Sequence, residues 1–77
     1  MLKEGSIKVG TEIFHYWVES KRGRSKHGID GGKITKLTIT GARGIEVNYD
    51  RGWGIEPGEK DDEAMLLAYS IILKDYN

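Results

Sequence analysis

The chain of 77 residues contains no cysteine, only one proline and no net charge, and each absence excludes a class of protein. Without cysteine there can be no disulfide framework, no thiolate zinc site and no cysteine nucleophile. Twelve basic residues balance twelve acidic ones, which removes the simplest argument for a protein that coats nucleic acid by charge alone. A chain of this length predicts a single small domain, residues 1–77.

Long apolar stretches are also missing. The longest, at residues 64–69, is far shorter than the roughly 20 residues that span a bilayer. The first residues, MLKEG, contain no apolar segment of signal-peptide length. We therefore expect a cytoplasmic protein that does not bind membranes.

The residues that usually carry chemistry are sparse. His15 and His27 are the only histidines, and they and the scattered acids match no metal-ligand spacing. No serine stands in a Gly-x-Ser-x-Gly turn, and the glycine-rich segment 28–33 lacks the P-loop spacing. The sequence thus predicts no metal, no cofactor and no catalytic residue, and we expect a protein that is not an enzyme.

Alternating apolar and polar residues predict an antiparallel meander. Gly10-Thr11 and residues 41–44 are typical of hairpin turns between its strands. Residues 21–32 and 51–58 alternate poorly and are rich in turn-forming residues, so both are predicted to be loops. The strands are predicted at residues 6–9, 12–20, 34–40 and 45–50.

The C-terminal segment predicts one helix, with Asp61 as its N-cap and its end near Asp75. The predicted fold class is α+β: a small antiparallel β-meander of three to four strands with one C-terminal helix packed across one face. Helical periodicity brings six apolar or aromatic side chains onto the predicted packing face: Met65, Leu66, Tyr69, Ile72, Leu73 and Tyr76.

Strand periodicity divides the sheet residues between two faces. The helix-packed face is predicted to carry Phe14, Tyr16, Val18, Leu37, Ile39, Val47 and Tyr49. A single helix covers only one face, so the other face would be exposed. That face is predicted to carry His15, Trp17, Lys36, Thr38, Glu46 and Asn48.

Two groups of residues are candidates for binding a protein partner. Leu67 and Ile71 lie four residues apart and off the predicted packing face, as a dimer or partner contact would. The alternative is that a bent sheet or a loop covers them. Arg51 and Trp53, in a turn between strands and helix, are residue types that dominate interface hot spots. The alternative is that Trp53 closes one end of the core and that Arg51 pairs with a neighbouring acid.

A third group is a candidate for binding nucleic acid. The loop at residues 21–27 holds four basic residues, and Trp17 on the preceding strand could stack on a base. The alternative is a solvated hairpin tip. The candidate residues are Trp17, Lys21, Arg22, Arg24 and Lys26.

Four segments carry a resemblance to a known family: FHYWV at 14–18, GIDGGKITKL at 28–37, NYDRGWGIEP at 48–57 and KDYN at 74–77. The chain resembles a family of short uncharacterised proteins that are frequent in Firmicutes genomes, prophages and integrative elements. It departs from the family's pattern at Gly54, where an acid is expected, and at Gly58, where a Ser or Thr cap is usual. The resemblance implies no activity, cofactor or catalytic residue.

We therefore expect a non-enzymatic protein-binding module. One form of it is a phage- or element-encoded modulator or inhibitor of a host or defence protein, and a weak homodimer is a further possibility. The alternative is a small nucleic-acid-binding sheet protein that uses the basic loop at residues 21–27 and exposed aromatic side chains.

Overall fold

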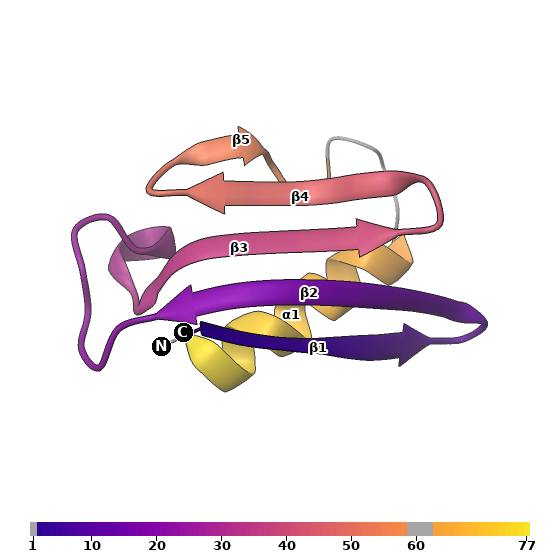
Figure 1. Ribbon diagram of the computed structural model, residues 1–77, viewed down its shortest axis with the longest axis horizontal. Helices are drawn as coiled ribbons and strands as arrows, with labels where there is room; N and C mark the ends of the chain where they lie inside the picture. The colour runs from indigo at the N-terminus through magenta and orange to yellow at the C-terminus, as the bar shows by residue number, and fades with distance from the viewer. Residues whose placement is uncertain (1, 59–62) are drawn as a thin grey trace.

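The computed structural model describes residues 2–58 and 63–77, which form one five-stranded antiparallel sheet with a single α-helix behind it (Figure 1). The strands follow one another across the sheet in chain order, so each pairs with its neighbour in sequence. A short 3-10 helix, η1, interrupts the long loop between the second and third strands. The elements are β1 (Leu2–Val9), β2 (Glu12–Ser20), η1 (Ile29–Gly31), β3 (Ile34–Gly41), β4 (Gly44–Asp50), β5 (Trp53–Ile55) and α1 (Glu63–Tyr76).

This architecture confirms the α+β meander with one C-terminal helix and corrects the number of strands to five. The additional strand, β5, lies in the segment predicted to be a loop. Arg51 adopts a left-handed φ of 60°, and the backbone N–H of Asp50 donates to the carbonyl of Gly52 at 3.0 Å. This tight reversal brings Trp53 into register with Tyr49. The predicted N-cap, Asp61, lies outside the described residues.

The first hairpin is longer than its sequence suggests. β1 begins at Leu2 and not at Ser6, and its eight residues pair with β2 in unbroken register. Gly10 supplies the positive φ, 63°, that the two-residue turn between Val9 and Glu12 requires. The turn predicted at Gly10-Thr11 is thus confirmed.

The core lies between the sheet and α1, on the predicted face. Burial of β-branched and aromatic side chains against a helix is the main stabilising term in such a small domain. Three predicted aromatic or aliphatic residues of α1, Tyr69, Leu73 and Tyr76, are only partly buried at its edge. The buried hydrophobic residues of the core are Phe14, Val18, Ile29, Ile34, Leu37, Ile39, Val47, Tyr49, Met65, Ala68 and Ile72.

A bulge in β4 overturns one predicted position. The register shifts between Ile39 and Thr40, so that Val47 pairs with Ile39 while Ile45 pairs with Thr40. The extra residue, Glu46, turns inward and is only 2% exposed, whereas Ile45 is exposed. The prediction that Glu46 lies on the exposed face was therefore wrong. Its carboxylate lies 3.9 Å from the guanidinium of Arg43.

The face of α1 that packs on the sheet differs slightly from the predicted one. Leu66, predicted to pack on the sheet, is exposed, and the small side chain of Ala68 is fully buried instead. Met65 and Ile72 are buried as predicted. Within the part of the chain that the structure describes, no helix is long and apolar enough to cross a membrane.

The long loop between β2 and β3 is fastened to the domain at several points. Ile29 is buried in the core, and the backbone N–H of Ser25 donates to the carbonyl of Gly32 at 2.9 Å. The last residue, Asn77, accepts from the backbone N–H of Ile34 at 2.9 Å and donates to the carbonyl of Ile29 at 3.2 Å. A Cβ at Gly32 would collide with Asn77, so this close approach requires glycine.

Candidate functional site

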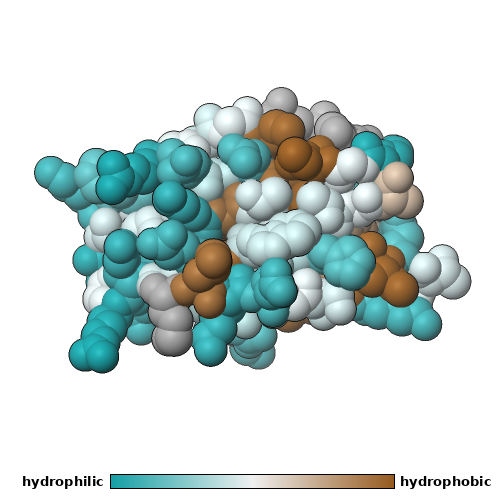
Figure 2. Space-filling view, in the orientation of Figure 1, coloured by the Kyte–Doolittle hydropathy of each residue, from teal (hydrophilic) through white to brown (hydrophobic). Residues whose placement is uncertain are grey.

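Among residues 2–58 and 63–77, no helix lies over one face of the sheet, and we call it the open face. In the view of Figure 2 this face is turned to the reader, with hydrophobic patches separated by neutral and hydrophilic areas. Pairing in register arranges its side chains in rows across the strands. Four of its residues are large, hydrophobic and exposed: Leu2, Ile13, Trp17 and Ile45.

Trp17 occupies the middle row of the open face. It lies between Glu4 of β1 and Thr38 of β3, and its side chain is 40% exposed. A depression of about 390 Å³ adjoins it, lined by Glu4, Gly5, Ser6, His15, Tyr16 and Trp17. The depression is open to solvent beside the indole ring.

The charges of the open face are mixed in sign. In the row next to Trp17, Glu19 faces Lys36, and Lys36 faces Asp50. Glu4 lies directly opposite Trp17. Because acids alternate with bases here, Trp17 and the basic loop do not form one continuous positive surface.

The structure separates the members of the basic loop. Arg22, Arg24 and Lys26 are exposed, and Figure 2 shows this end of the molecule as strongly hydrophilic. Lys21 instead turns back toward the sheet, where its ammonium lies 3.6 Å from the carboxylate of Glu19. The ion pair with Glu19 therefore holds Lys21 against the end of β2.

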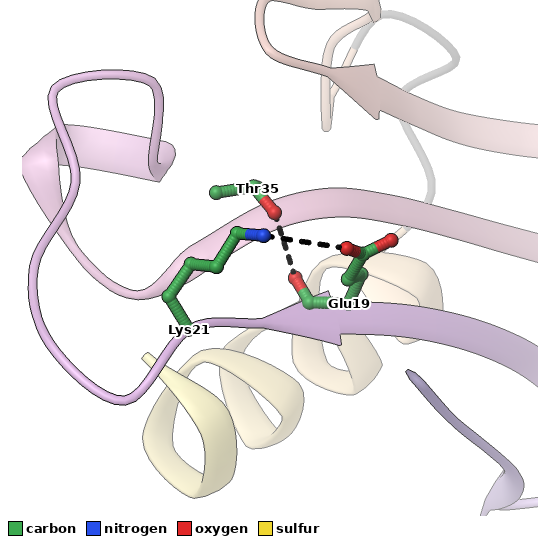
Figure 3. A network of polar contacts seen from close by, with 3 residues as sticks. All are labelled: Glu19, Lys21 and Thr35. Atoms are coloured by element: carbon green, nitrogen blue, oxygen red, sulfur yellow. Dashed lines mark hydrogen bonds and ion pairs between the residues drawn. The ribbon is translucent and has the colours of Figure 1, made fainter. Parts of the chain in front are cut away.

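Lys21 belongs to a second hollow, which we call the loop pocket. Its volume is about 120 Å³, and it lies where β2, β3 and the long loop meet. Figure 3 shows Lys21 reaching across the end of β2 toward Glu19, with Thr35 beside them on β3. The residues that line it are four bases, two hydroxyls and one acid: Lys21, His27, Lys36, Arg51, Ser25, Thr35 and Glu19.

Hydrogen bonds to the backbone hold the walls of the loop pocket. The hydroxyl of Thr35, which is buried, donates to the carbonyl of Glu19 at 3.4 Å, and the N–H of Arg51 donates to the carbonyl of Thr35 at 3.0 Å. On the loop side, the hydroxyl of Tyr49 donates to the carbonyl of His27 at 2.7 Å. The side chain of Ser25 accepts from the N–H of His27 at 3.1 Å.

Arg51 and Trp53, predicted as one candidate site, have different surroundings. Arg51 lines the loop pocket, whereas the ring of Trp53 packs on Tyr49 with centroids 4.8 Å apart and on Tyr69 at 6.1 Å. Burial of its side chain is the largest cause that raises the pKa of Tyr69 to about 12. Trp53 therefore helps to close the end of the core, although part of it stays exposed.

Leu67 and Ile71, the other predicted partner residues, lie on the outer side of α1. Their side chains are 52% and 37% exposed, and the neighbouring Ala64 is partly buried. We call Leu67 and Ile71 the helix patch. It belongs to the helix and not to the open face, so the two surfaces are separate candidates.

Sequence reasoning missed most of the loop pocket. Ser25, His27, Thr35 and Lys36 come from a loop and a strand that show no motif. The pairing register between β2 and β3 shifts between Glu19 and Ser20, so that Glu19 pairs with Lys36 and Ser20 pairs with Ile34 at the start of β3. Only the pairing register could have indicated this cluster, and no local pattern in the sequence gives that register.

Comparison with known proteins supplies a family but no activity. A model of a domain of unknown function, DUF7678, matches residues 1–77, so the chain belongs to this family over its whole length. No curated protein and no solved structure matches the chain. Within the described residues, no three acidic or histidine side chains come together as metal ligands would.

Proposed function

We propose that this protein is a non-enzymatic protein-binding module whose interface is the open face, centred on Trp17. The observation that carries the proposal is the partly exposed indole in the middle of an uncovered sheet, beside a depression. Tryptophan is among the residue types that supply most of the binding energy at protein interfaces, near their centre.

The composition of the open face favours a protein over nucleic acid. Scattered exposed aliphatic residues such as Ile13 and Ile45 give apolar area, and acids and bases alternate around Trp17. Interfaces of complexes that form and dissociate have this mixed character. A nucleic-acid surface would instead concentrate positive charge along the path of the phosphates, and Glu4, Glu19 and Asp50 oppose that.

The nature of the partner follows from the resemblance to short proteins of Firmicutes genomes, prophages and integrative elements. Proteins encoded by such elements often act on proteins of their host. We therefore propose a host or defence protein as the target, and modulation or inhibition as the effect.

The test compares two single substitutions on different surfaces. The wild-type protein, Trp17→Ala and Leu67→Ala are immobilised, and proteins captured from the source cell are quantified by mass spectrometry. We expect a partner that wild type and Leu67→Ala retain equally and that Trp17→Ala loses. With that partner purified, Trp17→Ala should weaken binding by about 30-fold, the effect of losing about 2 kcal/mol at a hot spot.

Two results would contradict this proposal. Capture that is unchanged in Trp17→Ala would remove the open face from the interface. Capture that disappears after nuclease treatment, and direct binding that falls steeply with salt and depends on Arg22 and Arg24, would support the nucleic-acid alternative. Thermal melts of both variants establish that each one is folded.

A further inference from the structure

The loop pocket has the composition of an anion site. We propose that it binds a dianionic phosphate group, either free phosphate or a phosphate monoester, through Lys21, Lys36 and Arg51, with the hydroxyls of Ser25 and Thr35 as neutral donors. This site goes beyond the proposed function, because it lies at the edge of the open face and does not include Trp17.

The charge of the pocket matches a dianion. Two lysines and one arginine line it, and the single lining acid is Glu19. Glu19 is already 3.6 Å from Lys21, so it neutralises part of that one charge. Lys36 and Arg51 form no ion pair with any residue in the described ranges 2–58 and 63–77. A ligand with two negative charges would compensate them, whereas a phosphodiester brings only one.

The size and shape of the pocket also suit a small tetrahedral anion. Its volume, about 120 Å³, admits a phosphate group but not a nucleotide. Hydroxyl, ammonium and guanidinium groups are the donors that phosphate oxygens prefer, since charge-assisted hydrogen bonds are about twice as strong as neutral ones. Thr35 is buried at the pocket wall, and its hydroxyl can donate to a ligand in place of its long bond to Glu19.

The backbone around the pocket is fixed before any ligand arrives. Arg51 keeps a left-handed conformation, φ 60°, that is unfavourable for a residue with a β-carbon. The backbone N–H of Arg51 donates to the carbonyl of Thr35. On the opposite wall, the hydroxyl of Tyr49 donates to the carbonyl of His27. A rigid backbone reduces the entropy that binding must overcome, so even a small ligand can be held.

The experiment is an NMR titration of the full chain with inorganic phosphate at low ionic strength and pH 8, where the dianion predominates. We expect saturable shifts in the amide signals of Ser25, His27, Lys36 and Arg51. Lys36→Gln and Arg51→Asn should each weaken the apparent affinity by about ten-fold, the loss of one charge-assisted hydrogen bond. Asparagine is chosen at position 51 because it tolerates a left-handed φ.

Matched variants separate a built site from diffuse attraction. Arg22→Gln and Arg24→Gln remove the same charge from the same end of the molecule without touching the pocket, and we expect less than a two-fold change. Asp50→Asn, which removes the acid paired across from Lys36, should strengthen binding. An equal loss in the four variants that remove a positive charge, or no saturable shift in the folded wild type, would overturn the site.

Two further probes identify the source of the phosphate group. A short peptide that carries phosphoserine should compete with inorganic phosphate for the same signals if a modified side chain is the natural ligand. Binding of phosphate without competition by the peptide would identify free phosphate as the ligand. A single-stranded oligonucleotide that binds the pocket more tightly than both inorganic phosphate and the phosphoserine peptide would overturn the assignment. A negative result in the phosphate titration would not affect the capture of a partner through Trp17. The two proposals can therefore be rejected independently of each other.

Discussion

The face under α1 buries Phe14, Val18 and Ile39 almost completely, whereas the open face leaves Ile13 and Trp17 in contact with solvent. Both faces come from the same strands, because successive side chains of a strand point to opposite sides. The two faces differ because α1 covers only one of them. Substitutions on the covered face should therefore reduce stability, and substitutions on the open face should reduce binding.

Two adjacent isoleucines of α1 give the largest expected contrast. Ile72 is 1% exposed and Ile71 is 37% exposed. Ile72→Ala should destabilise the fold by about 2–5 kcal/mol, because it removes buried methylene groups and leaves a cavity. Ile71→Ala should change stability by less than about 1 kcal/mol. Chemical denaturation measures both, and equal midpoints for the two variants would place Ile72 outside the core.

The periodicity that distinguishes Ile72 from Ile71 was readable from the sequence, and so were the faces of β2 and β3. The bulge in β4 was not, because Ile45 to Asp50 alternates without interruption, and one additional residue opposite Thr40 inverts the pattern only once the strands pair. β5 was also missed. Three residues around Gly54 are too few to show alternation, and the pairing of β5 depends on the reversal at Arg51.

The candidate site was harder to predict than the fold for a related reason. Trp17 could be assigned to the exposed face by counting along its strand. The loop pocket needs Lys21, Thr35 and Arg51 to meet, and they come from three segments of the chain. The position of the loop depends on the buried Ile29 and on Asn77 at the other end of the sequence. Neither the composition nor the spacing of residues predicts that Ile29 and Asn77 hold the loop in this position.

Alkaline pH should weaken the covered face selectively. The hydrogen bond between the hydroxyls of Tyr16 and Tyr76, 3.1 Å long, is the largest cause that raises the pKa of Tyr16 to about 12, and burial adds to it. In the unfolded chain this pKa is about 10. The folded state therefore holds its proton more tightly, so this stabilisation is complete below about pH 10 and is lost as the pH rises toward 12.

Tyr16→Phe tests this pH dependence. The free energy of unfolding of the variant should be lower by about 0.5–1.5 kcal/mol at neutral pH, because the hydrogen bond is removed. Its stability should also fall less steeply than that of wild type between about pH 10 and 12. Tyr69→Phe should also reduce the slope, since the pKa of Tyr69 is raised to about 12 mainly by burial. Denaturation midpoints across this range provide the measurement. Identical slopes in wild type and Tyr16→Phe would contradict the assignment.

The smallest expected effect concerns the helix patch, which belongs to neither face of the sheet. Leu67 is 52% exposed, and together with Ile71 it could meet its own copy across a two-fold axis. The patch is small compared with the roughly 1,200–2,000 Å² of a stable interface, so we predict only weak self-association. Leu67→Glu combined with Ile71→Glu should lower the sedimentation coefficient at high concentration toward that of a monomer. Leu66→Glu, on another side of the same helix, adds one charge at a similarly exposed leucine and should leave sedimentation unchanged. If wild type already sediments as a monomer at high concentration, the self-association is wrong, and Trp17 on the open face remains the centre of the proposed interface.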